Sequence, residues 1–194
     1  MSNQRLIKFH IQEHINTVNK LHDNEGLIDD IVAAVKAIIA SLEQGGTLFW
    51  CGNGGSASDS QHLAAELVGR FKKNRKALRS IALTTDSSIL TCVANDFSFD
   101  QIFSRQIEGL ARPNDVLVGL STSGNSSNVL KAFDMATLMG VARIGLLGGS
   151  GGAALNSVQY PILVPSDSTA HIQESHIMIG HIMCELIEQG LCFA

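Results

Sequence analysis

The order of short apolar runs along this chain constrains its fold more than any other feature. After Gly45 and Gly46, apolar runs alternate with stretches of helical periodicity. The runs are TLFWC, SIALTT, DVLVGLS, ARIGLLG and YPILVP. Such alternation is typical of a parallel sheet flanked by helices. The pattern therefore predicts an α/β domain with a doubly wound, five-stranded parallel sheet.

The segment before the first strand, residues 1–45, predicts a pair of amphipathic helices. Apolar residues recur at helical spacing over residues 4–22 and again over residues 27–42. The two apolar faces must cover either the sheet of the same chain or another subunit, and we favour a subunit interface. We expect residues 1–194 to form a single domain that includes this helical pair.

Composition places the chain among ordinary globular domains. With 194 residues and a hydrophobic fraction of 45%, it is long enough to form a core. The net charge of -4 argues against nucleic acid as a direct ligand. The 4 cysteines lack CxxC spacing and the density of a disulfide-rich domain. No stretch resembles a signal peptide or could cross a bilayer, so we expect a soluble cytoplasmic protein without a membrane partner.

Two polar loops follow the first and third predicted strands. In a flavodoxin-like strand order the winding reverses between these strands, and ligands bind at their carboxyl ends. The loops read GNGGSAS, residues 52–58, and STSGNSSN, residues 121–128, and each leads into a predicted helix. Glycines let the backbone approach a ligand, and helix N-termini favour anions. We expect the loops to hold the phosphate of a small polyhydroxylated molecule.

Other interpretations of these loops are weaker. Gly52, Gly54 and Ala57 fit the GxGxxG/A pattern of dinucleotide-binding folds. The next acid near a strand end is Asp86, well beyond the usual spacing of about 20 residues. No GK[ST] sequence follows either loop, which argues against a P-loop. Tight turns with capping serines are an alternative for either loop alone, and a weaker one for both loops at the predicted switch point.

Ionisable side chains on two predicted helices suggest a site for chemistry. His62 and Glu66 lie four residues apart and project from one helix face. This spacing suits two ligands of one metal ion, or a ligand and a general base, and an ordinary exposed contact is the alternative. The last helix carries Gln173 and His181 as well as two other histidines, His171 and His176. Gln173 and His181 are roughly 12 Å apart along a helix axis, so either the helix starts irregularly or a neighbouring subunit closes the site.

The run RFKKNRKALR, residues 70–79, contains six of the 14 basic residues. Solvated surface is the usual explanation of such a run. Arg70 lies one further turn beyond Glu66, and we give equal weight to an alternative in which it faces the ligand and steers an anion.

Together these motifs resemble the phosphoheptose isomerases of the sugar isomerase (SIS) fold. The similar segments are CGNGGSASDSQHLAAEL, VANDF, STSGNSSNV and IQESHIMIGH, and they span residues 51–181 in the family's order. The resemblance implies interconversion of sedoheptulose 7-phosphate and D-glycero-D-manno-heptose 7-phosphate, an aldose–ketose isomerisation that begins heptose synthesis for bacterial lipopolysaccharide. It also implies a homotetramer with one zinc ion per subunit and with sites at subunit interfaces.

Carried over by position, the resemblance also implies two sets of site residues. The implied metal ligands are His62, Glu66, Gln173 and His181. The implied sugar-phosphate contacts are Asn53, Gly54, Gly55, Ser56, Glu66, Asn95, Asp96, Ser121, Thr122, Ser123, Ser126 and Gln173. The chain departs from the family at His171, where many members have arginine, so no contact is carried over to that position.

An aldose–ketose isomerisation needs a base and an acid that move protons through an enediol. Glu66 is the only acid on the loop-proximal helix face that also pairs with a histidine, so we assign it the carbon proton transfer. His181 would move protons at the oxygens, and zinc would polarise the carbonyl.

Two rival functions belong to other classes. One is a non-catalytic SIS-fold protein that binds the replication-initiation protein, but such a scaffold has no need for the acid–base pair of Glu66 and His181. The other is a regulatory sugar-phosphate sensor, for which the chain has no separate DNA-binding segment.

Overall fold

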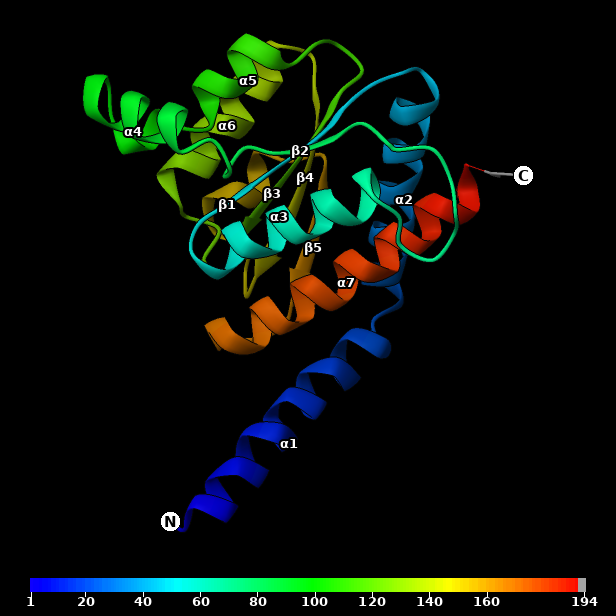
Figure 1. Ribbon diagram of the computed structural model, residues 1–194. Coiled ribbons are helices and arrows are strands. Elements are labelled where there is room, and N and C mark those ends of the chain that lie inside the picture. Colours follow the sequence, from blue (N-terminus) through cyan, green and yellow to red (C-terminus); the bar gives the residue numbers. More distant parts are fainter. Residues whose placement is uncertain (192–194) are drawn as a thin grey trace.

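The computed structural model describes residues 1–191, which form one sheet between two layers of helices (Figure 1). The strand order is β2-β1-β3-β4-β5, and all neighbouring strands are parallel. The strands are β1 (Leu48–Gly52), β2 (Ser80–Ala82), β3 (Val116–Ser121), β4 (Ala142–Gly148) and β5 (Tyr160–Val164). This order confirms the predicted doubly wound, flavodoxin-like sheet, in which the winding reverses between β1 and β3.

Helices α2, α3 and α7 cover one face of the sheet, and α4, α5 and α6 cover the other (Figure 1). The helices are α1 (Asn3–His22), α2 (Glu25–Glu43), α3 (Gly55–Val68), α4 (Ser87–Asp96), α5 (Ser104–Leu110), α6 (Ser127–Leu138) and α7 (Thr169–Gly190), with short 3-10 helices η1 (Phe99–Gln101) and η2 (Gly152–Asn156). Within residues 1–191, none of them combines the length and hydrophobicity that a membrane span requires. The cysteines in this part of the chain are free thiols: Cys51, Cys92 and Cys184.

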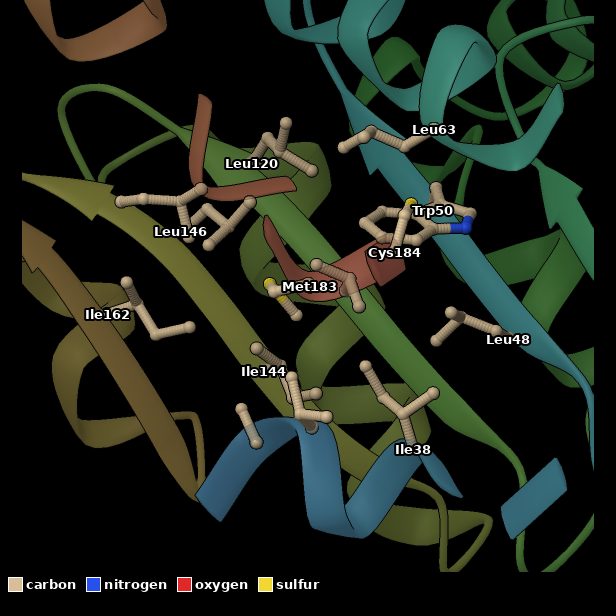
Figure 2. Packing of buried hydrophobic residues seen from close by; sticks show 14 of the residues in the cluster. Ile38, Leu48, Trp50, Leu63, Leu120, Ile144, Leu146, Ile162, Met183 and Cys184 are labelled. Atoms are coloured by element: carbon tan, nitrogen blue, oxygen red, sulfur yellow. The ribbon is translucent and has the colours of Figure 1, made fainter. Parts of the chain in front are cut away.

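Alternation along the strands divides the core into two clusters. In β1, Leu48 and Trp50 belong to the cluster beneath α2, α3 and α7, whereas Phe49 and Cys51 belong to the cluster beneath the other layer. Figure 2 shows the first cluster, where Trp50 and other strand side chains gather with Met183 and Cys184 of α7. Because β1 is buried on both faces, it reads in the sequence as a continuous apolar run.

The two N-terminal helices have different environments. α2 packs against β5 and α7 of its own chain and buries Leu27, Val35 and Ile38. For α2, therefore, the apolar face covers the sheet of the same chain. α1 projects from the domain (Figure 1) and buries only Thr17 and Leu21 near its C-terminal end. Its exposed apolar residues are Leu6, Ile7, Phe9, Ile11 and Ile15. The predicted subunit interface therefore depends on α1.

The basic segment between α3 and β2 is only partly solvated. The side chain of Arg75 is fully buried and pairs with Glu188 of α7, with 2.8 Å between Nε and Oε1. Its guanidinium also donates to the carbonyl oxygens of Leu67 (2.8 Å) and Glu66 (3.0 Å) at the end of α3. Arg70 is exposed. The expectation of a solvated run is thus wrong at Arg75, because this side chain ties the segment to α3 and α7.

The stability of the fold should depend on pH through His176, which is buried in α7. Its Nε2 lies 3.2 Å from the carbonyl oxygen of Leu147, and burial lowers its pKa from 6.5 to about 4. Between the pKa of 6.5 in the unfolded chain and that of about 4 in the folded chain, the His176 imidazole binds a proton when the chain is unfolded and stays neutral when it is folded. We expect the free energy of unfolding to fall as the pH drops through the range, by up to roughly 1.4 kcal/mol per pH unit.

Urea denaturation across this pH range checks the prediction. The variant His176→Gln lacks the titrating imidazole, so its free energy of unfolding should fall less steeply towards acidic pH. Parallel profiles for the wild type and the variant would show that His176 is not the cause.

Candidate functional site

The loops after β1 and β3 meet at the carboxyl edge of the sheet. β1 and β3 are paired neighbours, with Gly52 opposite Leu120. Just beyond this pair, the side-chain amides of Asn53 and Asn128 exchange two hydrogen bonds of 2.8 Å each. Asn128 is buried, and its Oδ1 also accepts the N–H of Val129 (3.0 Å). The amide pair therefore clamps the two polar loops together at the switch point.

Serine hydroxyls organise the loop after β3. Ser121 Oγ lies 3.1 Å from Ser126 Oγ and accepts the N–H of Gly124 at the same distance. Thr122 and Ser123 line a cavity of about 270 Å³ together with the end of β4 and the start of α7. Hydroxyl and amide groups of this kind can hydrogen-bond the oxygens of a phosphate. The structure thus brings the predicted serine and threonine contacts together around one loop.

The helices that leave the two loops begin without a side-chain cap. α3 starts after Gly54 and α6 after Ser126, and neither of these N-cap residues accepts a helix N–H with its side chain. The side chains of Ser2, Asn24 and Asp86, by contrast, cap α1, α2 and α4. In α3 the N–H of Ala57 bonds the carbonyl oxygen of Gly54, and in α6 the N–H of Val129 bonds Oδ1 of Asn128. The N–H groups that precede these two in each first turn are therefore the ones available to an anion.

Close packing brings Gln173 of α7 to the loop after β1. Gly54 has a φ of 56°, in the left-handed region that favours glycine. A Cβ on Gly55 would lie 2.8 Å from the side-chain amide of Gln173, so a side chain there would displace this amide. Ser56 is buried at the start of α3. The loop residues Gly54 and Gly55 and the distant Gln173 therefore share one region, as their predicted role requires.

A close crossing of α3 and α7 assembles a group of ionisable side chains. At the crossing, a Cβ on Gly180 would come within 2.5 Å of the buried Leu63 side chain, so any larger residue would force Leu63 or the helices to shift. The crossing places His181 beside His62, with their Nε2 atoms 2.9 Å apart. Glu66, one helical turn beyond His62, has its Oε1 3.3 Å from His62 Nε2. We call His62, Glu66 and His181 the His62 group.

The His62 group has the chemistry of a metal site. Its ligand atoms, two imidazole nitrogens and a carboxylate oxygen, all lie within 4.8 Å of one another. Zn²⁺ and related divalent transition ions take these ligands, so the residues present fit such an ion. Gln173, the fourth predicted ligand, lies two turns before His181 on α7, with its amide against Gly55.

Two residues around the His62 group escaped the sequence analysis. Burial raises the pKa of the Asp59 carboxyl, and nearby His62 and His181 act in the opposite direction. Asp59 lies one turn before His62, and this three-residue spacing was the available sequence signal. Glu66 is therefore not the only acid of α3 that can pair with His62, contrary to the expectation from the sequence. Phe71 stacks on His181, with ring centroids 5.5 Å apart and planes 7° from parallel. No local pattern marks Phe71, because its position depends on the buried attachment of residues 70–79 to α7.

Two predicted sugar-phosphate contacts lie apart from the other site residues. Asn95 and Asp96 end α4, in the helix layer opposite α3 and α7. Both are exposed, and Asn95 Nδ2 donates to Asp96 Oδ1 (2.8 Å). Hydrogen bonds from Asn95 and Cys92 hold the pKa of Asp96 below its usual range. Their role in binding stays a prediction. His171 also lies outside the His62 group and instead contacts Glu174.

The amide clamp between the two loops should contribute measurably to stability. Asn128→Ala is expected to lower the free energy of unfolding by about 1–3 kcal/mol, because it leaves the amide of Asn53 without its partner. Urea denaturation measures the change. Asn16→Ala, at an exposed position on α1, is the matched control and should have little effect. Equal midpoints for the two variants would contradict the clamp.

Comparisons with known proteins agree with this architecture. The SIS domain family matches residues 12–148, which include both polar loops. The phosphoheptose isomerase of Geotalea daltonii is 52% identical over 183 residues, which cover 93% of this chain and 95% of that protein. Solved phosphoheptose isomerase structures from Neisseria gonorrhoeae and Francisella tularensis superpose with TM-scores of 0.91 and 0.93 at 39% and 36% identity, and each comparison covers 97% of this chain and 100% of the other. The chain therefore belongs to the phosphoheptose isomerase family of SIS-domain enzymes.

Proposed function

We propose that this isomerase interconverts sedoheptulose 7-phosphate and D-glycero-D-manno-heptose 7-phosphate through an enediol. The observation that carries the proposal is the position of the His62 group relative to the polar loops. α3 runs from the loop after β1 to His62 and Glu66. α7 carries Gln173 against the same loop and His181 within the His62 group. A sugar phosphate whose phosphate binds at the polar loops would extend its carbonyl end towards the His62 group.

The phosphate is proposed to bind at the loops of the switch point. Hydroxyls of the loop after β3 and the first N–H groups of α6 would donate hydrogen bonds to its oxygens. The proposed contacts there are Ser121, Thr122, Ser123 and Ser126, and across the clamp Asn53, Gly54, Gly55 and Ser56. Gln173 would orient the sugar hydroxyls. Asn95 and Asp96 are exposed on α4, and we propose that they contact the ligand where the site meets a neighbouring subunit.

Glu66 is proposed to carry the proton between the two reacting carbons. Its carboxylate is partly buried, with 23% of the side chain exposed, and lies beside an imidazole. It would take the proton from the carbon next to the carbonyl and return it to the former carbonyl carbon. His181 would move protons at the two oxygens, since an imidazole nitrogen can accept a proton and donate it again. The stacked ring of Phe71 restrains the plane of His181 during this exchange.

We propose zinc as the ion of the His62 group, held by its three side chains and by Gln173. When bound, such an ion polarises a carbonyl oxygen and stabilises negative charge on it. Removing metal with a chelator should therefore abolish most turnover, and added Zn²⁺ should restore it. Elemental analysis of the protein before and after chelation gives the metal content independently of activity. Metal-free protein with full activity would contradict the zinc assignment.

Incubation with sedoheptulose 7-phosphate, followed by identification of the product, tests the proposed reaction directly. Formation of D-glycero-D-manno-heptose 7-phosphate supports the proposal, and the absence of turnover by folded, zinc-loaded protein contradicts it. The relatives named above are isomerases, which leaves the alternative of a non-catalytic protein that binds the replication-initiation protein without support.

We further propose a cytoplasmic homotetramer that supplies heptose precursors for bacterial lipopolysaccharide. The exposed apolar face of α1 supports the assembly, because contiguous apolar surface commonly marks a protein interface. Light scattering on the purified protein measures the mass of the assembly.

A further inference from the structure

A second group of ionisable side chains connects α1 to the start of α7. It consists of His14 from α1 and of His171 and Glu174 from α7, and their ligand atoms all lie within 4.8 Å of one another. Oε2 of Glu174 is 2.9 Å from Nδ1 of His14 and 3.2 Å from Nδ1 of His171. We call these three residues the His14 group. It shares no residue with the His62 group.

The contact between His14 and Glu174 leaves a nitrogen unsatisfied. Although the two atoms are close, their arrangement is not that of a hydrogen bond, and buried Nδ1 of His14 has no hydrogen-bond partner among the described residues. Buried polar atoms without partners are rare and need an explanation. Two ligand atoms of one tetrahedral zinc ion lie about 3.3 Å apart. The distances from Glu174 Oε2 to the two Nδ1 atoms, 2.9 and 3.2 Å, are close to this value. An ion between these side chains would satisfy the nitrogen and the carboxylate together.

The space around the group suits a small cation. A cavity of about 260 Å³ between the two helices is lined by His10, Ile11, His14, Ile15, His171 and Glu174. Its polar lining therefore consists of three imidazoles and one carboxylate. His10 precedes His14 by one helical turn, so both face the cavity and His10 offers a further nitrogen. The side chains of His14 and Glu174 are 33% and 54% exposed, which leaves an ion a path from solvent.

We propose that His14, His171 and Glu174 form a binding site for a divalent transition cation of the zinc class, separate from the proposed catalytic metal. Imidazole nitrogens favour Zn²⁺ over Mg²⁺ and Ca²⁺, which prefer oxygen ligands. The bound ion links α1, which projects from the domain, to the first turns of α7 (Figure 1). Gln173 lies between the two α7 ligands in the sequence, so the ion also steadies the helix turn that presents this amide to the loop after β1.

Counting bound metal in matched variants tests the proposal. Apoprotein is titrated with Zn²⁺ by calorimetry, and elemental analysis after desalting gives the zinc content of each chain. The variant with both His62→Ala and His181→Ala removes the proposed catalytic site and should still bind one zinc ion per chain. Adding His14→Ala and Glu174→Gln to this variant should abolish that binding. His22→Ala, at an exposed histidine also on α1, should leave it unchanged.

A second measurement separates metal binding from misfolding. In the variant that lacks His62 and His181, Zn²⁺ should slow amide hydrogen exchange in residues 3–22, and Glu174→Gln should remove the slowing without changing the circular dichroism spectrum. If the variant that lacks His62 and His181 binds no zinc, or if His14→Ala and Glu174→Gln leave its zinc content intact, the proposal is wrong. Neither result bears on the proposed isomerase reaction, which the turnover of sedoheptulose 7-phosphate tests independently.

Discussion

Glu66→Gln is expected to lower kcat by about 10²–10⁴-fold while the sugar phosphate still binds. The amide keeps the size of the carboxylate but cannot accept the proton from carbon. The polar loop after β1 lies at the other end of α3 and the polar loop after β3 precedes α6, so both should be unaffected and KM should change much less than kcat. Steady-state kinetics with sedoheptulose 7-phosphate measure both constants.

The proposed metal role of Glu66 requires a control for zinc loss. Zinc content should therefore be determined on the same Glu66→Gln sample and compared with that of the wild type, because the His14 group is also proposed to bind zinc. A variant that holds as much zinc as the wild type but is inactive isolates proton transfer. Glu43→Gln, at an exposed position at the end of α2, is the matched substitution and should keep wild-type kinetics. Near-normal turnover by Glu66→Gln would remove Glu66 from its assigned role.

Glu188→Gln is expected to lower the free energy of unfolding by about 3–5 kcal/mol, as when one partner of a buried ion pair is removed. Each carboxylate oxygen of Glu188 accepts two hydrogen bonds. Oε1 accepts from Phe71 N (3.0 Å) and Arg75 Nε (2.8 Å), and Oε2 accepts from Lys72 N and Lys73 N (2.9 Å each). Whichever way the glutamine amide is placed, its NH₂ group faces two donors, and the buried charge of Arg75 loses its partner.

The pKa of Glu188 reflects the same contacts. Burial alone would raise it, but the backbone N–H donors and Arg75 outweigh burial and hold the pKa below its usual range. Glu185→Gln is the matched control, because Glu185 on the same helix pairs with Lys72 (2.7 Å) and keeps 38% of its side chain exposed. That substitution should cost less than about 1 kcal/mol. Urea denaturation compares the two variants, and similar midpoints would show that the buried carboxylate is dispensable.

Loss of the Glu188 contacts should also change the environment of His181 in the His62 group. The segment that Glu188 anchors includes Phe71, whose ring stacks on His181. Phe71 therefore connects the buried Glu188 contacts to the proposed catalytic histidine, His181. Nothing in the local sequence indicates this connection, since Glu188 and Arg75 lie 113 residues apart.

The sequence by itself determined the parallel sheet, its strand order and the two polar loops at the switch point. These features follow from local patterns, because apolar runs, helical periodicity and glycine-rich turns each act over a few residues. The metal-binding chemistry of His62 and Glu66 was also visible, since a spacing of four residues places both side chains on one helix face.

Only the tertiary structure decided which distant residues meet. His62 and His181 are 119 residues apart, and they touch because Gly180 lets α3 and α7 cross closely over Leu63. The amide clamp between the loops and the placement of α2 on its own sheet likewise depend on how side-chain volumes fit together. A sequence pattern specifies the face that a helix or strand presents, whereas packing against the other elements of the chain selects the partner of that face.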